Sequence, residues 1–217
     1  MENEARPAGT NRLEPGRLDR LLRVFTDVEP GEAGTALLMF VSLFLLLLGY
    51  YVLRTLREPL ILASGAEVKS YAAAGQALTL MGFVPLYGWF ASKVRRSQLI
   101  LGFILFFVVC IELFSFAGQA GVPHVGVVYY IWVGIFSLAT IAQFWSFAND
   151  IYRREAGERL FPFIFLGATL GAPVGGEFAR WLFDSRVNPY EMMHVTTALL
   201  LVHLVLYRVV ERREAGR

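Results

Sequence analysis

Three charged side chains stand at the end of a stretch that should otherwise lie in lipid. Residues 33–53 contain no charged side chain, and Arg54, Arg57 and Glu58 follow before the apolar residues resume at Pro59. A charge within or at the edge of a membrane-spanning helix is costly, and it usually faces a water-filled cavity or a partner. Spacings of three and four put these side chains on one helical face. Two guanidinium groups on such a face can bind an anionic solute, as a transporter would.

The same residues have a second interpretation, as an interfacial anchor. A helix that begins near residue 33 reaches Arg54 after about 30 Å, at the far headgroup region, where arginine side chains extend into water. Arg54 and Glu58 are four residues apart, so they can also form an ion pair within the helix. Lys69 follows in a predicted outer loop. The sequence leaves both interpretations open.

The composition is that of a membrane protein. Hydrophobic residues make up 56% of the 217 residues, charged residues only 18%, and the mean hydropathy is +0.51. The net charge of +2 is too small to indicate a nucleic-acid partner. One cysteine, Cys110, excludes an intrachain disulfide, and the three histidines lack ligand spacing, so neither a metal nor a cofactor is expected. No nucleotide-hydrolase, serine-hydrolase or metalloprotease motif occurs, so an enzyme is not expected.

Six apolar runs predict an all-α, polytopic membrane protein. A helix needs about 20 residues to cross a hydrocarbon core of about 30 Å. The runs are continuously apolar rather than alternating, which disfavours a β-barrel. They predict a transmembrane domain over residues 35–210, between tails at residues 1–34 and 211–217. The predicted spans are residues 35–61, 71–90, 99–116, 122–147, 160–182 and 194–210.

The distribution of lysine and arginine predicts the orientation. If the N-terminus is cytoplasmic, the cytoplasmic segments hold 15 of the 20 basic residues. Because basic residues concentrate in cytoplasmic loops, both termini are expected on the cytoplasmic side of a bacterial inner membrane. Residues 17–25 alternate arginine with apolar side chains. This pattern suits an amphipathic helix on the membrane surface, and a solvated tail is the alternative.

Small residues in the fifth predicted span indicate close helix packing. Gly167, Gly171 and Gly175 recur every four residues, and Pro173 lies among them. Such a stripe lets a second helix approach closely, and a proline removes one backbone hydrogen bond and favours a bend. A hinge or seal during transport would use the same residues. The run resembles the glycine–proline signature of facilitator-type antiporters, with one extra residue between Gly171 and Pro173.

Other polar residues within the spans are candidates for coupling or for lining a solute path. Glu112 and Glu177 are intramembrane carboxylates, and each is a candidate proton or ion site or a partner for a basic residue. Gln143 and Asn149 lie near the end of the fourth span, where Asn149 either lines the inner mouth or caps the following helix.

The cytoplasmic loop between the second and third spans is basic. Residues 88–96 read Gly-Trp-Phe-Ala-Ser-Lys-Val-Arg-Arg. This run resembles a loop signature of the major facilitator superfamily, except that Ser92 stands where that family usually has an acid. The positive-inside rule alone also accounts for the three basic residues.

Four runs together resemble the ATP/ADP translocases of plastids and intracellular bacteria, over about residues 25–176. The runs are residues 50–58 (Tyr-Tyr-Val-Leu-Arg-Thr-Leu-Arg-Glu), 83–88 (Phe-Val-Pro-Leu-Tyr-Gly), 144–150 (Phe-Trp-Ser-Phe-Ala-Asn-Asp) and 159–168 (Arg-Leu-Phe-Pro-Phe-Ile-Phe-Leu-Gly-Ala). The resemblance implies half of a major-facilitator-like bundle of about twelve spans. It also implies nucleotide transport, by ATP:ADP exchange or by import with protons or phosphate.

The chain departs from the family pattern at two residues. The family motif has a lysine where this chain has Arg57, which keeps the charge but not its geometry. The family also has a glutamate important for exchange where this chain has Val133. Six spans are half of such a carrier, so an incomplete reading frame, a homodimer or a second chain that supplies the other half is expected.

Two functions follow as hypotheses. The first is a transporter, or half-transporter, that moves ATP, ADP or another phosphate-bearing anion by alternating access. Its substrate-binding residues would be Arg54, Arg57, Glu58, Gln143 and Asn149, with Glu58 orienting one arginine. The alternative is a non-transporting membrane anchor or interaction module, or a truncated fragment, derived from the same fold.

Overall fold

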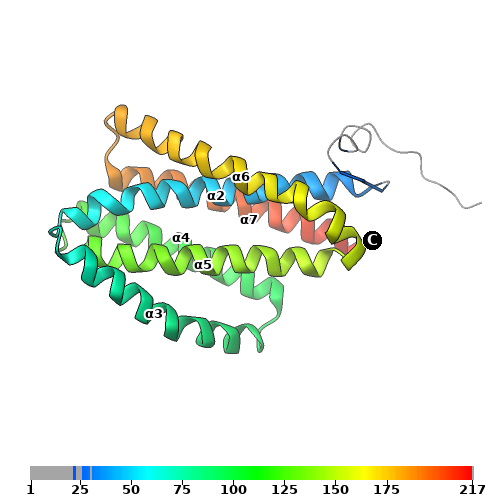
Figure 1. Cartoon of the computed structure of the whole chain (residues 1–217), viewed down its shortest axis with the longest axis horizontal. Coiled ribbons are helices and arrows are strands. Elements are labelled where there is room, and N and C mark those ends of the chain that lie inside the picture. Colours follow the sequence, from blue (N-terminus) through cyan, green and yellow to red (C-terminus); the bar gives the residue numbers. More distant parts are fainter. Residues whose placement is uncertain (1–21, 23–25, 30, 217) are drawn as a thin grey trace, which may run out of the picture.

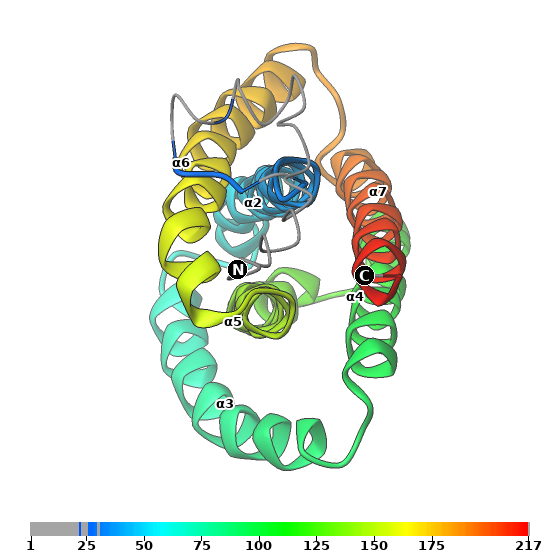
Figure 2. The same ribbon diagram turned by 90° about the vertical axis from the view of Figure 1, so that its right-hand side faces the viewer.

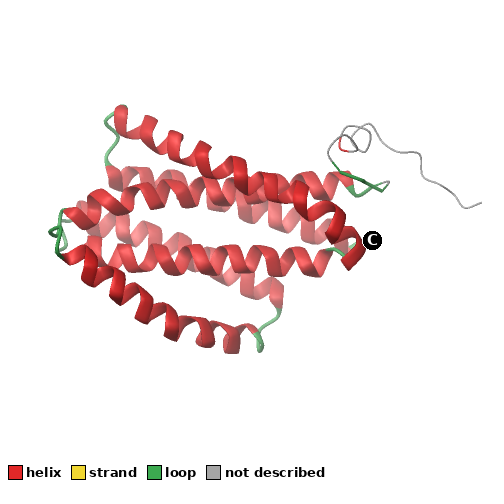
Figure 3. Cartoon of the chain, in the orientation of Figure 1, coloured by secondary structure: helices red, strands yellow, loops and turns green. Residues whose placement is uncertain are grey.

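The chain folds as a bundle of long helices. The computed structural model describes residue 22, residues 26–29 and residues 31–216, and no strand occurs in that part of the chain (Figure 3). The predicted amphipathic segment, residues 17–25, lies outside the described residues except for Leu22. The helices are α2 (Ala33–Leu62), α3 (Val68–Ala91), α4 (Arg96–Gln119), α5 (Val125–Ile151), α6 (Arg154–Asp184) and α7 (Pro189–Ala215).

Each helix overlaps one predicted span, although α5 begins three residues later than its span, and the six are not equally apolar. Five of them, α2, α4, α5, α6 and α7, are long and apolar enough to cross a membrane. Helix α3 has 24 residues, enough length to cross, but glycines, alanines and polar side chains such as Gln76 and Thr79 dilute its apolar character. The expectation of an all-α, polytopic membrane protein is therefore confirmed, with α3 as the weakest of the six expected spans.

Two helices form the middle of the bundle. Helices α2 and α5 lie side by side, with α7 and α4 along one side of them and α6 and α3 flanking the other side (Figures 1 and 2). Tyr129 on α5 donates a hydrogen bond of 2.9 Å to the carbonyl oxygen of Leu53 on α2. Ser42 of α2 lies with its Oγ 2.8 Å from His203 Nδ1 of α7. Helix α2 thus contacts α5, α6 and α7 at once.

The small-residue stripe of α6 packs directly against the backbone of α2. A Cβ added to Gly171 would lie 2.5 Å from the carbonyl oxygen of Phe44, and one added to Gly175 would lie 2.6 Å from that of Leu48. Gly167 faces the carbonyl of Phe40 in the same way. Both sets of residues advance by four in the same direction, so the two helices run parallel and no side chain fits between them.

The prolines of α6 do not break it. The helix continues from Arg154 to Asp184 through Pro162 and Pro173. The bend expected at Pro173 stays a prediction. Pro173 is exposed, whereas Gly171 and Gly175 on either side of it are buried against α2. The proline therefore points away from the contact that the glycines make.

We predict that Gly171→Ala weakens the bundle. The new methyl group meets a backbone carbonyl, which cannot rotate away as a side chain would, so the free energy of unfolding should fall by about 1–3 kcal/mol. Unfolding of the purified protein by sodium dodecyl sulfate in mixed micelles measures this change. The matched control is Gly176→Ala, because a Cβ at Gly176 has nothing within 4 Å. Equal stability of the two variants would contradict the prediction.

Candidate functional site

The two arginines at the end of α2 lie against aromatic rings rather than carboxylates. The guanidinium carbon of Arg57 lies 4.2 Å from the centroid of the Tyr130 ring on α5. That of Arg54 lies 5.3 Å from the ring of Tyr51, and its Nη1 is 3.5 Å from the Tyr51 hydroxyl. Arg54 is exposed and Arg57 is half-buried. Stacking on a ring face stabilises a cation modestly and leaves its N–H groups able to donate.

Neither arginine forms an ion pair with a carboxylate in the described part of the chain. The buried Nε of Arg57 also has no hydrogen-bond partner. A buried donor without a partner is costly. The pair of cations, which we call the outer arginine pair, therefore retains unused capacity for an anion.

Glu58 pairs with Lys69 rather than with Arg54 or Arg57. Its Oε2 accepts a hydrogen bond of 2.9 Å from Lys69 Nζ. Lys69 lies in the first turn of α3 rather than in a loop, and the short connection from α2 brings the two side chains together. Both are nearly half exposed, so this ion pair contributes little stability. Its effect is to occupy the carboxylate closest in sequence to Arg54 and Arg57.

Gln143 does not join the outer arginine pair. It is 5% exposed and lines a small enclosed cavity of about 20 Å³ with residues of α2, α4 and α7, including Ser42 and His203. Tyr130 and Gln143 are 13 residues apart on α5, or about 20 Å along its axis. Gln143 therefore lies apart from the outer arginine pair, and its place along a solute path stays a prediction.

Asn149 lies at the opposite end of α5 from the outer arginine pair. It belongs to α5 itself and donates a hydrogen bond of 2.9 Å to the Trp145 carbonyl, so it does not cap α6. The 19 residues from Tyr130 correspond to about 28 Å. Asn149 lines a hollow of about 660 Å³ between the end of α5 and the start of α6, together with Arg153 and Arg154. The structure thus separates the expected site into an outer and an inner region.

The two intramembrane carboxylates have different surroundings. Glu112 of α4 accepts a hydrogen bond of 2.6 Å from Thr197, and its other oxygen lies 2.8 Å from His194 Nδ1, both on α7. Glu177 instead pairs with Arg180 one turn along α6, where both side chains are about 70% exposed. Glu112 therefore belongs to a contact between helices, whereas Glu177 forms a surface pair. Among the described residues, no group of three or more acidic, histidine or cysteine side chains is placed to hold a metal.

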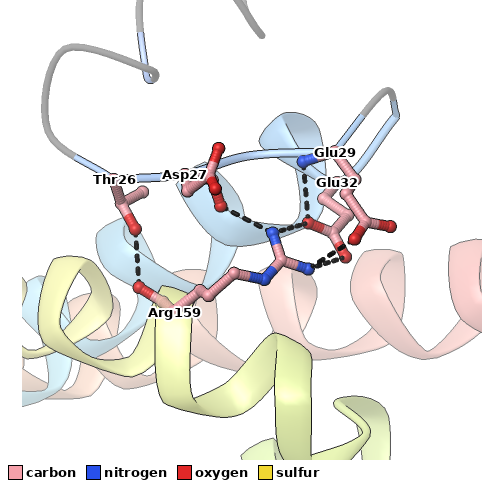
Figure 4. A network of polar contacts seen from close by, with 5 residues as sticks. All are labelled: Thr26, Asp27, Glu29, Glu32 and Arg159. Atoms are coloured by element: carbon pink, nitrogen blue, oxygen red, sulfur yellow. Dashed lines mark hydrogen bonds and ion pairs between the residues drawn. The ribbon is translucent and has the colours of Figure 1, made fainter.

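Arg159 fastens the segment before α2 to the start of α6 (Figure 4). Its guanidinium donates to the Asp27 carbonyl at 2.6 Å and contacts the carboxylates of Glu29 and Glu32 at 3.1 and 3.3 Å. Thr26 Oγ1 donates to the Arg159 carbonyl at 2.6 Å. Arg159 is 24% exposed and Glu32 only 18%, so water competes weakly for this contact. We call these five residues the Arg159 clasp.

Several of these functional contacts could not be read from the sequence. Tyr130 has no polar motif around it that singles it out, and its role depends on how α5 packs against α2. The pairing of Lys69 with Glu58 has a weak signal, since opposite charges flank a short predicted loop. The clasp has none, because it joins residues more than 120 positions apart.

Comparisons with known proteins bear on the first three helices. A family model described as TLC ATP/ADP transporter matches residues 16–117. The matched region contains the outer arginine pair and α2, α3 and nearly all of α4. No curated protein and no solved structure matches the chain.

We predict that Arg159→Gln releases the clasp. Loss of the guanidinium removes the ion pairs with Glu29 and Glu32. A hydrogen bond to a charged group contributes about 1.5 kcal/mol or more, which corresponds to about a tenfold change in an equilibrium. Amide hydrogen exchange in residues 26–32 should therefore accelerate about tenfold. Exchange measured by mass spectrometry tests this. Arg154→Gln is the control, because Arg154 pairs with Glu158 on its own helix, with 88% of its side chain exposed. Unchanged exchange in the Arg159 variant would show that the clasp does not hold this segment.

Proposed function

We propose that this chain, whose residues 16–117 match the TLC ATP/ADP transporter family, acts in transport. The proposed solute is a phosphate-bearing anion such as ATP or ADP. The family is one of carriers, not enzymes. In this proposal the solute moves by alternating access across a bundle whose first six helices are described above.

The single observation that supports this proposal most is the outer arginine pair. Arg54 and Arg57 lie one turn apart, stack on tyrosine rings and make no ion pair with a carboxylate in the described part of the chain. Guanidinium groups bind phosphate oxygens by two parallel hydrogen bonds, which a tyrosine ring does not obstruct. In this proposal, the solute supplies the negatively charged partner for these two cations.

The proposed path leads from the outer arginine pair to the hollow near Asn149. The basic residues around this hollow, Arg153 and Arg154, also favour an anion there. Glu112 with His194 is the proposed proton-coupling pair, because it connects two helices. Glu177 is the weaker proposal for that role, since Arg180 already neutralises it at the surface.

A second six-helix unit, either another copy or a separate half, is the proposed partner. Helices α3 and α6 flank a side of the bundle on which α2 and α5 have no further covering helix (Figure 2). The proposed location is a bacterial inner membrane with both termini cytoplasmic. Thr35 at the start of α2 donates a hydrogen bond of 2.6 Å to Glu214 at the end of α7, which supports an even number of crossings.

A non-transporting membrane module is the second candidate. Val133 favours this candidate. It is 1% exposed, in the core, at a position where the resemblance to the ATP/ADP translocases implies a glutamate. The absence of a carboxylate at this position removes one group on which nucleotide exchange would depend. Uptake measurements separate the two candidates.

We predict that Arg54→Ala and Arg57→Ala each reduce uptake of radiolabelled ATP or ADP by at least about tenfold. Each change removes charge-assisted hydrogen bonds worth about 1.5–3 kcal/mol. Cells or proteoliposomes that carry the chain provide the assay. Arg57→Lys should retain more uptake than Arg57→Ala but less than the unaltered chain, because it keeps the cation and loses the planar group that binds two phosphate oxygens.

The control is Arg186→Ala, which removes an exposed arginine from the α6–α7 loop. Equal amounts of inserted protein must be verified for every variant. Uptake that is unaffected in both arginine variants would remove the outer pair from the site. If the unaltered chain moves no nucleotide even when a second half is supplied, the membrane-module candidate is favoured.

We also predict that position 54 is reached by water. In a Cys110→Ala background, Arg54→Cys should react with a membrane-impermeant thiol reagent, because Arg54 is exposed at the end of α2. Leu53→Cys is the matched control, since Leu53 is 0% exposed and its carbonyl accepts a hydrogen bond from Tyr129 of α5. The side of the membrane from which labelling occurs tests the orientation. Failure to label position 54 from either side would contradict a hydrated site.

A further inference from the structure

A groove separates α3 from α4 next to the loop that connects them. Helix α3 packs on α5, whereas α4 packs mainly on α7, so the two helices diverge from residues 92–95. The groove has a volume of about 520 Å³. Its walls are almost entirely apolar and include Phe83, Tyr87 and Phe90 from α3 and Leu99, Phe103 and Phe106 from α4.

The shape of the groove suits an acyl chain. Its aromatic walls extend for about two turns on each helix, or about 10 Å. Tyr87 and Phe103 meet edge to face with centroids 5.2 Å apart and join the two walls. Gly102 also lines the groove, and a Cβ added there has nothing within 4 Å. No side chain of the described residues therefore fills the space above this glycine.

The mouth of the groove carries cations. Lys93 Nζ lies 4.5 Å from the ring centroid of Trp89, a residue that lines the groove. Arg95 immediately precedes α4 and is exposed. In the described part of the chain neither has a carboxylate partner, whereas the adjacent Arg96 pairs with Asp150. Two unpaired positive charges thus border an apolar groove at what the basic-residue distribution predicts to be the cytoplasmic surface.

We propose that this groove binds one anionic phospholipid of the cytoplasmic leaflet. Lys93 and Arg95 bind the headgroup phosphate, and one acyl chain lies between α3 and α4 above Gly102. The positive charges select an anionic lipid, because a zwitterionic headgroup cancels the charge of its own phosphate. The site is separate from the outer arginine pair and does not depend on which solute, if any, the chain carries.

Native mass spectrometry of the full chain in detergent tests the proposal. Phosphatidylglycerol and phosphatidylcholine with identical acyl chains are titrated in parallel. Because each basic residue near the surface contributes about fivefold in affinity for an anionic lipid, Lys93→Gln with Arg95→Gln should weaken phosphatidylglycerol binding about 25-fold and leave phosphatidylcholine unchanged. Lys93→Arg should retain the preference.

A second variant tests the acyl-chain half of the site independently. Gly102→Leu places a side chain in the groove and should displace the lipid without altering charge. Gly82→Leu is its matched control, since Gly82 is also an exposed helical glycine with open space around it, but it does not line the groove. Equal affinity of the unaltered chain for both lipids would overturn the proposal, as would phosphatidylglycerol binding that survives both the charge variant and Gly102→Leu in folded protein.

Discussion

The backbone contact between α2 and α6 is the constraint on which the rest of the bundle depends. Lipid gives two apolar helices no hydrophobic reason to associate, so close packing and polar contacts must hold them together. Three glycines of α6 supply that packing along the N-terminal half of α2, and the Arg159 clasp adds polar contacts at the same end. Helix α2 also forms hydrogen bonds with α5 and α7. The contact between α2 and α6 therefore helps to position four helices, α2, α5, α6 and α7. The last turns of α2, with Arg54 and Arg57, are then held at a defined position.

The energetics of the outer arginine pair follow from this placement. Moving a cation into an apolar interior without a partner is strongly unfavourable, so Arg57 is only half-buried and covers its charge with the Tyr130 ring. Cation–π contact of this kind recovers about 1–2 kcal/mol, less than an ion pair with good geometry. A site completed by a carboxylate of the same chain would be more stable but would compete with an anionic solute. The observed arrangement keeps the cations available, which is the property that the proposed function uses.

The sequence predicted the helices well because the bilayer determines their length and composition. It did not show that Gln143 and Asn149 lie far from the arginines, because helical periodicity gives relative faces but not the neighbour that each face meets. Gln143 lines a small cavity and Asn149 lines the hollow beside α6, since α5 is antiparallel to α2 and carries its polar end far from Arg57. The contact of Glu58 could not be read from the sequence for a related reason. Helical spacing offers Arg54 as its partner, whereas the turn into α3 brings Lys69 to it.

Val133 keeps the contact between α2 and α5 apolar at the position where the resemblance implies a glutamate. On α5, Tyr129 donates to the Leu53 carbonyl and Phe136 stacks with Tyr50, so Val133 lies at a level of α2 between Tyr50 and Leu53. A glutamate there would be a counter-charge inside the protein and would reduce the attraction of the pair for an anion. With valine, the core stays apolar and the positive charge near Arg54 is not offset from α5.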